Sequence, residues 1–368
     1  MILEPGPRRG TMRVPVSKSH AHRVLLAEFL SGWTKALKPD PLDCADVAAT
    51  KRCLAALADA KGNEVRLDVG ESGTTRRLLG PVVAALGLKP EWVMRGRLAS
   101  RPQIDYPVLE AGVHRLAGDV SSQFVSGLLF ALPLVKGDSE IRLTTPLQSR
   151  GYVDMTLDVV RAYGVEVDEG TDGFRVRGGQ VYRAPAEGPA FETDWSSAAF
   201  PLAMNALGSD ISLKGCEGLA ATSRQPDRAI VRLLADLPRE IDVSQFPDLF
   251  PVLTVVAARL AGRTVFRGIG RLRIKECDRV AAMEDVLRRF GVEVSVTETE
   301  FALTGVGRPF PGGGAFRSFN DHRIALSVSV GATAAERPVE LDDIACADKS
   351  YPTFFEDLEA LKKWELYT

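Results

Sequence analysis

The charged segment 273–279 reads Arg-Ile-Lys-Glu-Cys-Asp-Arg and stands directly before an apolar-periodic stretch. Apolar residues then recur at helical spacing over 280–290, which predicts that the segment lies at a helix N-terminus. Unpaired backbone N–H groups and the helix dipole make such an end a site for anions, and Lys275 and Arg279 strengthen that bias. Glu276 is then the odd member, a carboxylate held among positive charges. A solvated first turn with local ion pairs is the alternative for this stretch taken alone.

Polar residues also begin several predicted helices that are otherwise apolar, although a buried helix needs a cap and does not need cations. Lys18, Ser19 and Arg23 lie about one helical turn apart, so these side chains are expected to project from one face toward an anion. Ser121 and Ser122, followed by Gln123, offer hydroxyl and N–H donors of the kind that cradle phosphate. If such starts converge between two domains, they make one polyanion site. The other starts read Glu71-Ser72-Gly73-Thr74-Thr75-Arg76-Arg77, Thr193-Asp194-Trp195-Ser196-Ser197, Phe246-Pro247-Asp248 and Asn320-Asp321-His322-Arg323.

Each cation in these starts also has a plainer explanation. Lys18 has the pattern of a surface lysine near a helix start. Arg101, in Ser-Arg-Pro, has the pattern of a loop residue with no functional role. Arg77 fits a helix-surface arginine as well, and we expect Arg76 to be one. Lys349 lies in Cys-Ala-Asp-Lys-Ser-Tyr-Pro, a polar loop before a helix, and solvation is the expected explanation for this residue taken alone.

Capping is the plainer explanation for the polar residues. Ser149 opens an amphipathic helix, where a capping role stands beside phosphate binding. Asp248 follows Pro247 as an N-cap would, and the roles of cap and general base are compatible. His322 beside Asp321 points to acid–base chemistry, yet a histidine near a helix start is more often structural.

Composition and missing motifs exclude several classes of function. The 46 basic and 48 acidic residues give a net charge of −2, so no general attraction for nucleic acid is expected. His20 and His22 lack an HExxH or cysteine partner set, and we expect neither a metal nor another cofactor. The sequence also lacks the GxSxG elbow, the GxxxxGK(S/T) P-loop and the GxGxxG turn. A serine hydrolase, a P-loop protein and a Rossmann-type dinucleotide-binding protein therefore have no support from motifs.

Cysteine usage and hydropathy bear on the compartment. The cysteines are odd in number, scattered and without a CxxC pair, which fits free thiols in a reducing cytoplasm; they are Cys44, Cys53, Cys216, Cys277 and Cys346. The N-terminus lacks the apolar core of a signal peptide, and no apolar run approaches a membrane-spanning length. We therefore expect a cytoplasmic protein that does not act on membranes. We also expect a monomer, although neither pattern bears on the oligomeric state.

Two kinds of predicted helix alternate along the chain and must position the polar starts. Helices of the first kind are apolar on every side, which places them in the middle of a domain. They are expected over 19–30, 74–86, 121–134, 196–207, 248–260 and 321–334. Helices of the second kind carry charges opposite an apolar stripe and should line an outer surface. They are expected over 46–57, 104–111, 153–163, 225–237, 278–290 and 353–361.

Strand-like runs fill the gaps between these helices and complete an α/β (α+β) pattern. They are expected over 64–69, 140–143, 174–176, 210–213, 264–267 and 338–341. The alternations split into three plus three, which matches the two domains expected from 368 residues. The segment 182–193 breaks the periodicity and should hold the boundary. The residues before Lys18 form a strand too short to stand alone, so we expect them to pair with the second domain.

Taken in order, these motifs resemble the enolpyruvyl transferase family, most closely its branch that acts on shikimate 3-phosphate. Any one motif is weak, but the series covers nearly the whole chain, and its order is highly specific. The first-half motifs are Ser17-Lys18-Ser19 with Arg23, Ser72-Gly73-Thr74 with Arg77, Arg101-Pro102, Ser121-Ser122-Gln123-Phe124, and Ser149 with Tyr152. The second-half motifs are Asp194 with Ser196-Ser197, Pro247-Asp248, Lys275-Glu276 with Asp278-Arg279, Asn320-Asp321-His322-Arg323, and Lys349 with Pro352.

The resemblance implies two similar inverted α/β domains, each made of three βαβαββ units around buried helices. It assigns residues 17–192 to the shikimate 3-phosphate side. It assigns residues 1–16 and 193–368 to the acid–base and phosphoenolpyruvate side, with the active site in the cleft between the domains. The implied reaction transfers the enolpyruvyl group of phosphoenolpyruvate to the 5-hydroxyl of shikimate 3-phosphate and releases phosphate through a tetrahedral intermediate. This step belongs to the shikimate pathway toward chorismate and the aromatic amino acids.

The resemblance also implies roles for individual residues. Contacts to shikimate 3-phosphate correspond to Lys18, Ser19, Arg23, Ser121, Ser122, Gln123, Ser149, Tyr152, Asp248 and Lys275. Contacts to phosphoenolpyruvate correspond to Lys18, Gly73, Arg101, Gln123, Glu276, Arg279, Arg323 and Lys349. The catalytic set is Lys18, Asp248, Glu276 and Lys349. We favour Glu276 near the methylene carbon and Asp248 near the hydroxyl, with the two lysines as proton carriers.

Two positions depart from the family pattern, and three rival functions stay open. Glu71 stands where the family commonly has Asn, and it either repels the substrate, pairs with Arg76 or is protonated. Arg271 stands where Asn or Glu is common. The first rival is the sister enzyme that acts on UDP-N-acetylglucosamine; it typically has a reactive cysteine in the loop that corresponds to 95–101, and none is present here. The second is an enolpyruvyl transferase on another cyclic phosphate, and the third is a non-catalytic binding homologue.

Overall fold

The computed structural model describes residues 1–33, 35–40, 42–188, 190–215, 219 and 221–363. Its contacts divide the chain into two compact units, which are described separately below. The N-terminal unit consists of Lys18–Glu192 and Arg224–Pro226. The C-terminal unit consists of Met1–Ser17, Thr193–Ser223 and Asp227–Thr368. Relative to the boundaries expected from the sequence, Ser17 lies with the C-terminal unit and the segment 224–226 lies with the N-terminal unit.

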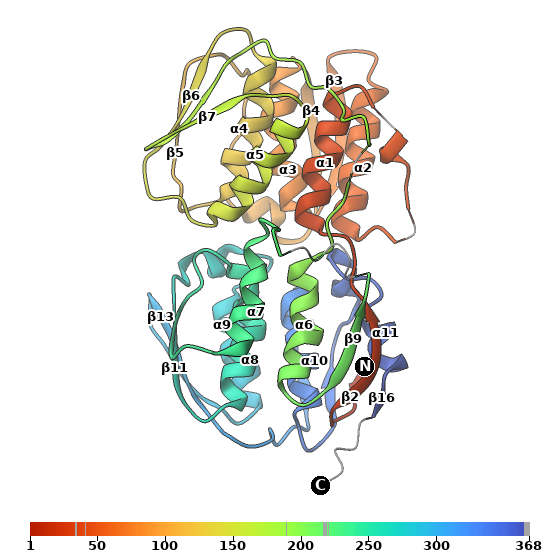
Figure 1. Cartoon of the computed structure of the whole chain (residues 1–368), viewed down its shortest axis with the longest axis vertical. Coiled ribbons are helices and arrows are strands. Elements are labelled where there is room, and N and C mark those ends of the chain that lie inside the picture. The colour runs from red at the N-terminus through yellow and green to blue at the C-terminus, as the bar shows by residue number, and fades with distance from the viewer. Residues whose placement is uncertain (34, 41, 189, 216–218, 220, 364–368) are drawn as a thin grey trace. The chain divides into compact units, whose positions relative to one another are not determined.

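The N-terminal unit packs helices between two sheets. The helices are α1 (Lys18–Leu30), α2 (Ala45–Ala58), α3 (Gly73–Ala85), α4 (Ser122–Ala131) and α5 (Arg150–Ala162), with short 3₁₀ turns η1 (Lys35–Leu37), η2 (Gly96–Ser100) and η3 (Leu132–Leu134). One sheet pairs β3 (Glu64–Gly70) with β4 (Lys89–Met94) in parallel. The second sheet has the order β5 (Val113–Leu116), β6 (Ser139–Leu143), β8 (Gly173–Val176) and β7 (Val167–Gly170). Figure 1 shows β5, β6 and β7 along one side of α4 and α5.

The C-terminal unit has the same layout with more strands. Its helices are α6 (Trp195–Ala206), α7 (Ala229–Ala235), α8 (Phe250–Arg259), α9 (Arg279–Arg289), α10 (His322–Thr333) and α11 (Phe354–Ala360). The 3₁₀ turns that concern the site are η6 (Pro247–Leu249), η7 (Gly270–Ile274), η8 (Ala345–Lys349) and η5 (Pro226–Arg228), of which only Pro226 belongs to the N-terminal unit. In Figure 1, β11 and β13 lie on one side of α6, α8, α9 and α10, and β2, β9 and β16 lie on the other.

The strands of the C-terminal unit form three sheets. The first has the order β1 (Ile2–Leu3), β15 (Val339–Leu341) and β14 (Ala315–Phe316). The second has the order β10 (Glu240–Asp242), β11 (Gly262–Arg267), β13 (Glu300–Gly305) and β12 (Glu293–Val296). The third has the order β16 (Lys362–Lys363), β2 (Arg8–Arg13) and β9 (Asp210–Lys214). The register of β2 on β9 pairs Arg9 with Asp210, so this N-terminal strand lies beside a strand from the second half of the chain.

One βαβαββ repeat is complete in each unit. The segments β5-α4-β6-α5-β7-β8 and β10-α8-β11-α9-β12-β13 have the same sheet order, a parallel first pair and an antiparallel closing hairpin. Further β-α-β crossovers are β3-α3-β4 and β14-α10-β15, each with a parallel strand pair. A crossover helix begins where its first strand ends, so the start of α3, α4, α8 or α10 lies at the carboxyl end of a strand. The polar helix starts therefore occupy equivalent places in the fold.

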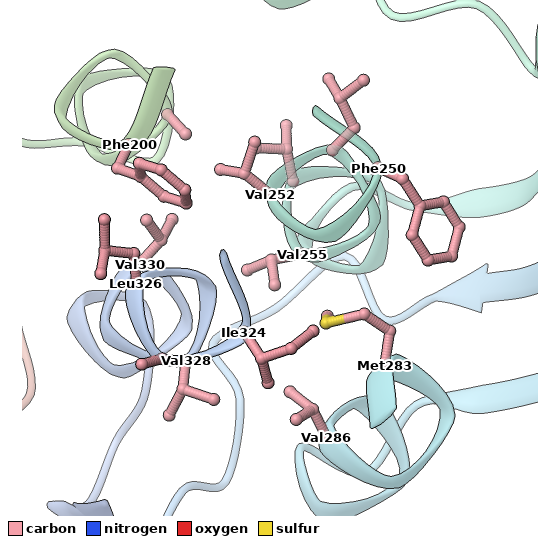
Figure 2. Packing of buried hydrophobic residues seen from close by; sticks show 14 of the residues in the cluster. Phe200, Phe250, Val252, Val255, Met283, Val286, Ile324, Leu326, Val328 and Val330 are labelled. Carbon is pink, nitrogen blue, oxygen red and sulfur yellow. The ribbon is translucent and has the colours of Figure 1, made fainter. Parts of the chain in front are cut away.

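The apolar helices lie in the middle of each unit, as their sequences predict. Every residue of α10 is buried. In Figure 2, Ile324 of α10 points toward Met283 and Val286 of α9, whereas Leu326 and Val330 face Phe200 of α6. Because α10 contacts neighbours on several sides, it has no face left for charged residues, and its ionisable residues, His322 and Arg323, are the first two residues of the helix.

Helix α10 illustrates the first kind of predicted helix, and α5 and α9 illustrate the second, with charged residues on exposed faces. Among the described residues, no helix has the length and apolarity that a membrane span requires. Among the described residues the buried cysteines take no part in a disulfide, namely Cys44, Cys53, Cys277 and Cys346, and Cys216 lies outside the described residues.

Two expectations around residue 105 are wrong. The segment 104–111 is not helical, because Pro107 lacks a backbone N–H and restricts Tyr106 to extended conformations. Asp105 instead pairs with Arg76. Arg76 was expected on a helix surface but is only 3% exposed, and its guanidinium also lies 4.2 Å from the centroid of the Trp92 ring.

Candidate functional site

The start of α3 in the N-terminal unit carries two guanidinium groups. A Cβ atom on Gly73 would lie 3.0 Å from Arg77 Nη1 and 3.2 Å from Arg101 Nη1, so a side chain there would push both guanidinium groups aside by a few tenths of an ångström. Arg77 is buried and donates through Nη2 to the Pro102 carbonyl oxygen at 3.1 Å. Ser72 caps the helix by accepting from Thr75 N at 3.3 Å. Two cations over an open helix start make a site suited to a phosphate or carboxylate.

The start of α4 joins this cluster through Gln123. Gln123 Oε1 accepts from Arg77 Nη1 at 2.7 Å, and its Nε2 donates to Thr74 Oγ1 at 2.8 Å. Ser121 is the N-cap and accepts from Gln123 N at 3.3 Å. Ser122, the first residue of α4, is buried at 3% exposure. The structure thus brings the predicted residues of α3 and α4 together, and it adds Arg77, whose role the sequence left open.

The start of α1 differs from the shared cationic face that the sequence led us to expect. Lys18 Nζ lies 3.0 Å from Asp46 Oδ2 of α2. Arg23 turns to α5 instead, where Nε donates to Thr156 Oγ1 at 2.7 Å and Nη2 to the Tyr152 carbonyl oxygen at 2.9 Å. The divergence arises because five residues rotate an α-helix by about 140° beyond a full turn.

Arg23 is a buried cation with neutral acceptors. Besides Thr156 and Tyr152, the Ser19 carbonyl oxygen accepts from Nη1 at 2.5 Å. Burial lowers the pKa of Arg23 to about 10, so the group keeps its charge at neutral pH. Ser149, before α5, has a left-handed backbone (φ 56°, ψ 43°) and makes no side-chain capping bond to α5 within the described structure. Capping therefore does not explain Ser149.

In the C-terminal unit one guanidinium connects three carboxylates. Arg279, the first residue of α9, is 1% exposed. Its Nη1 donates to Asp248 Oδ1 at 2.7 Å, its Nη2 to Glu276 Oε2 at 3.1 Å, and its Nε to Asp321 Oδ2 at 2.8 Å. Burial opposes its ionisation, but the three carboxylates outweigh burial and hold the pKa of Arg279 well above its ordinary value. The predicted acid–base residues Asp248 and Glu276 are thus held on the same cation.

Asp248 contacts further cations and is not a helix cap. Lys275 Nζ lies 3.5 Å from Asp248 Oδ1, and Arg323 Nη2 lies 3.6 Å from Asp248 Oδ2. The N-cap of α8 is Leu249, so the capping role expected for Asp248 is wrong: Asp248 lies inside the turn η6, one residue before that cap. Burial lowers the pKa of Lys275 to about 8, with Asp248 opposing the shift.

The charged segment that precedes α9 does lie at a helix start, as predicted. Asp278 is the N-cap and accepts from Val280 N and Ala281 N, both at 3.1 Å. Because Asp278 supplies the cap, Lys275 and Glu276 are not needed for it. Lys275 follows directly on η7, and Glu276 bonds to Arg279 one helical turn ahead.

A lysine also reaches the start of α10. Lys349 Nζ donates to the Asn320 carbonyl oxygen at 2.7 Å and to Asn320 Oδ1 at 2.9 Å. Asn320 and Phe319 both have positive φ, 53° and 55°, which is uncommon for residues other than glycine. Asp321 then caps α10 by accepting from Arg323 N at 2.9 Å. These contacts place Lys349 beside the segment that carries Arg323.

Sequence reasoning missed Asp227. It is 1% exposed and shares a hydrogen bond with Ser196 in the first turn of α6. The stretch 225–237 was expected to be an outer amphipathic helix, yet Asp227 lies in η5 and points inward. A signal was present in the sequence, because Pro226-Asp227 repeats the dipeptide Pro247-Asp248.

Comparison with known proteins identifies the family. A family model described as EPSP synthase (3-phosphoshikimate 1-carboxyvinyltransferase) matches residues 97–242 and 218–358. The chain belongs to the EPSP synthase family. A 3-phosphoshikimate 1-carboxyvinyltransferase of Clostridium kluyveri is 35% identical over 98% of this chain and 96% of its own length. One of Clostridium botulinum (strain Alaska E43 / Type E3) is 32% identical with the same coverage. The enzyme class and the family expected from the motif series are confirmed.

Solved structures of EPSP synthase-like proteins share the fold. An EPSP synthase from Acinetobacter baumannii has a TM-score of 0.73 and 21% identity, and the match covers 97% of each chain. The enolpyruvyl transferase NikO from Streptomyces tendae has a TM-score of 0.67 and 14% identity over 98% of this chain and 97% of its own. The expected enolpyruvyl transferase-like α/β fold is therefore confirmed.

Proposed function

We propose that the chain transfers the enolpyruvyl group of phosphoenolpyruvate to the 5-hydroxyl of shikimate 3-phosphate, giving 5-enolpyruvylshikimate 3-phosphate and phosphate. The main support for the proposal is that Asp248 and Glu276 accept hydrogen bonds from separate nitrogens of one buried cation, Arg279. The reaction needs one group to protonate the methylene carbon and one to take the hydroxyl proton. Two carboxylates on a fixed guanidinium meet that need.

The first substrate is assigned to the donors of the N-terminal unit and two residues of the C-terminal unit. Ser121 and Ser122 at the start of α4 supply hydroxyl and N–H donors for the 3-phosphate. The remaining shikimate 3-phosphate contacts in the proposal are Lys18, Ser19, Arg23, Gln123, Ser149, Tyr152, Asp248 and Lys275. Arg23 acts through its charge, because its described donors are bonded within the protein.

Phosphoenolpyruvate is assigned to cationic side chains of both units together with Gly73, Gln123 and Glu276. In the N-terminal unit, Arg101 lies over Gly73 at the α3 start, and Lys18 and Gln123 complete that part of the set. In the C-terminal unit the proposed contacts are Glu276, Arg279, Arg323 and Lys349. Because one substrate is assigned to residues from both units, we propose that the units act together on a single pair of substrates.

The chemical steps follow from these assignments. Asp248 accepts the proton of the 5-hydroxyl as its oxygen bonds to C2 of phosphoenolpyruvate, and Glu276 donates a proton to the methylene carbon. The tetrahedral intermediate then eliminates phosphate and loses a methyl proton to restore the double bond. Lys18 and Lys349 carry protons to and from these points. Guanidinium groups stabilise the charge on the phosphate and carboxylate throughout.

Phosphate release tests this function. The purified chain is assayed with phosphoenolpyruvate and either shikimate 3-phosphate or UDP-N-acetylglucosamine. Release with shikimate 3-phosphate alone is expected. Release only with UDP-N-acetylglucosamine would move the chain to the sister activity, and release with neither acceptor would refute the proposal. We further propose that the enzyme works in the cytoplasm, which is supported by buried cysteines that take no part in a disulfide, and that it is a monomer.

A further inference from the structure

Asp227 is a buried carboxyl group that the proposed reaction does not use. One oxygen, Oδ2, is hydrogen-bonded to Ser196 Oγ. The other, Oδ1, is buried and has no hydrogen-bond partner among the described residues. A buried ionised carboxylate normally has a cation or several N–H donors, so this arrangement favours a protonated carboxyl group.

Arg323 and Asp227 each contact the face of α6 that carries Ser196 and Phe200, and the two groups interact electrostatically. Ser196 and Phe200 are one turn apart on that helix and therefore point to the same side. Ser196 holds Asp227, and Arg323 Cζ lies 5.9 Å from the centroid of the Phe200 ring. Arg323 Nε and Nη1 are buried without a hydrogen-bond partner in the described part of the chain. The guanidinium thus keeps two donor positions for an anion.

Asp227 and Arg323 belong to a cluster of charged residues in the C-terminal unit, and the partners of each carboxylate identify the one that most easily holds a proton. Its carboxylates outnumber its cations; the members are Asp194, Asp227, Asp248, Glu276, Asp321, Arg271, Lys275, Arg279 and Arg323. Asp248, Glu276 and Asp321 accept from Arg279, and Asp194 accepts from Ser197 N at 3.1 Å. Asp227 alone has only a hydroxyl as its described partner.

Electrostatics agree with this assignment. The charged groups that face Asp227 are Asp248 on η6, Arg323 on α10 and Asp194 before α6. Burial, followed by the Asp248 carboxylate, raises the pKa of Asp227 from 3.8 to about 7, although Arg323 and the Ser196 hydroxyl oppose the shift. The group is therefore neutral below pH 7 and ionised above it.

We propose that Asp227 is a positioning residue that takes up a proton when an anion binds at Arg323. In its ionised form Asp227 competes with the anion for the guanidinium; in its protonated form it removes one negative charge from the cluster. The inference rests on the proposed function only in that the anion is phosphoenolpyruvate. Affinity for phosphoenolpyruvate should therefore fall as pH rises through 7.

The KM for phosphoenolpyruvate, measured from pH 6 to 8.5, tests the proposal. Asp227→Asn replaces the protonated carboxyl with a neutral isostere, and the exposed Asp236→Asn is the matched control. The ratio of wild-type to Asp227→Asn KM should be near one at pH 6 and rise to about three- to tenfold at pH 8.5. Asp236→Asn should follow wild type. Phosphoenolpyruvate's own phosphate titrates near pH 6, and the ratio cancels that contribution.

Two further measurements separate this role from a structural one. Ser196→Ala removes the hydroxyl that favours ionisation of Asp227, so the rise in KM should move to higher pH. Infrared spectra of the ligand-free protein should show a protonated-carboxyl band that disappears as pH passes 7 and is missing from Asp227→Asn. A KM ratio that stays constant within about twofold, or a band that persists in Asp227→Asn, would overturn the proposal. If wild type releases no phosphate, the proposed function fails, and the infrared spectra still decide the role of Asp227.

Discussion

Arg23 in the N-terminal unit and Arg279 in the C-terminal unit are both buried guanidinium groups, but the partners of Arg23 are neutral and those of Arg279 are charged. Arg23 donates to neutral oxygens, such as those of Thr156 and Tyr152. Arg279 donates to carboxylates, of which Asp248 is one. Burial accordingly lowers the pKa of Arg23, whereas the carboxylates hold the pKa of Arg279 above its ordinary value despite burial. Arg23 is therefore a buried positive charge with neutral hydrogen-bond partners, whereas Arg279 is a buried positive charge that holds carboxylates beside it.

The same contrast appears in the two complete βαβαββ repeats. The start of α4 presents the hydroxyls of Ser121 and Ser122, and the turn before α8 presents the Asp248 carboxylate. The two helices occupy equivalent positions in their sheets. A few residues at the helix start thus decide whether one topology supplies anion binding or acid–base groups.

Glu276→Gln should have the largest effect on activity. Loss of the proton donor is expected to reduce turnover by about 10²- to 10⁴-fold, because the amide cannot protonate the methylene carbon. Phosphate release at saturating substrates measures the change. Glu293→Gln, at an exposed position in β12, is the matched control and should retain wild-type turnover. Near-normal turnover of Glu276→Gln would refute the assigned role.

Arg279→Met and Arg23→Met compare the two buried cations by stability. Arg279→Met leaves several carboxylates without their cation and should cost about 3–5 kcal/mol of the free energy of unfolding. Arg23→Met leaves only neutral acceptors unsatisfied and should cost about 1–3 kcal/mol. Urea denaturation at pH 7 measures both values. A repeat of the measurement at lower pH should reduce the loss of stability in Arg279→Met but not in Arg23→Met, because the unpaired carboxylates of Arg279→Met can then take protons. If the loss in Arg279→Met were the same at pH 7 and at the lower pH, the proposed difference between the two cations would be contradicted.

Gly73→Ala should weaken phosphoenolpyruvate binding through the N-terminal unit. The added Cβ would lie 3.0 Å from Arg77 Nη1 and 3.2 Å from Arg101 Nη1, so both guanidinium groups must shift. A rise in KM for phosphoenolpyruvate of about tenfold, with a smaller change in kcat, is the expected result in steady-state assays. Gly62→Ala, where a Cβ meets no atom within 4 Å, serves as the control. An unchanged KM would remove Gly73 from the proposed site.

Lys275 should give the smallest effect, which is visible as a pH dependence. Burial lowers its pKa to about 8, so the side chain is charged below that pH and loses its charge above it. Affinity for shikimate 3-phosphate should therefore fall by up to about tenfold as pH rises through 8. Lys275→Arg keeps its charge and should flatten the profile. Calorimetric titration from pH 7 to 9 measures both proteins, and identical profiles would rule out Lys275 as the titrating group.

The sequence was most informative about which segments form helices and about the polar residues at the N-termini of those helices. Apolar periodicity predicted the buried helices, since a helix such as α10 with no polar face has only one place in a domain. The sequence did not predict hydrogen bonds between residues far apart in the chain. Arg77 and Gln123 are 46 residues apart, and Arg23 and Thr156 are 133 residues apart. No local pattern reports such contacts. Asp227 was missed because its segment also reads as an amphipathic helix.

Binding of shikimate 3-phosphate tests the division between the units most directly. Calorimetric titration compares wild type, Glu276→Gln and Ser122→Ala at pH 7. Wild type and Glu276→Gln should bind with the same Kd within about threefold, whereas Ser122→Ala, which loses a phosphate donor, should bind about tenfold more weakly. If Glu276→Gln lost as much affinity as Ser122→Ala, Glu276 would belong to shikimate 3-phosphate binding, and the assignment of acid–base chemistry to the C-terminal unit would be contradicted.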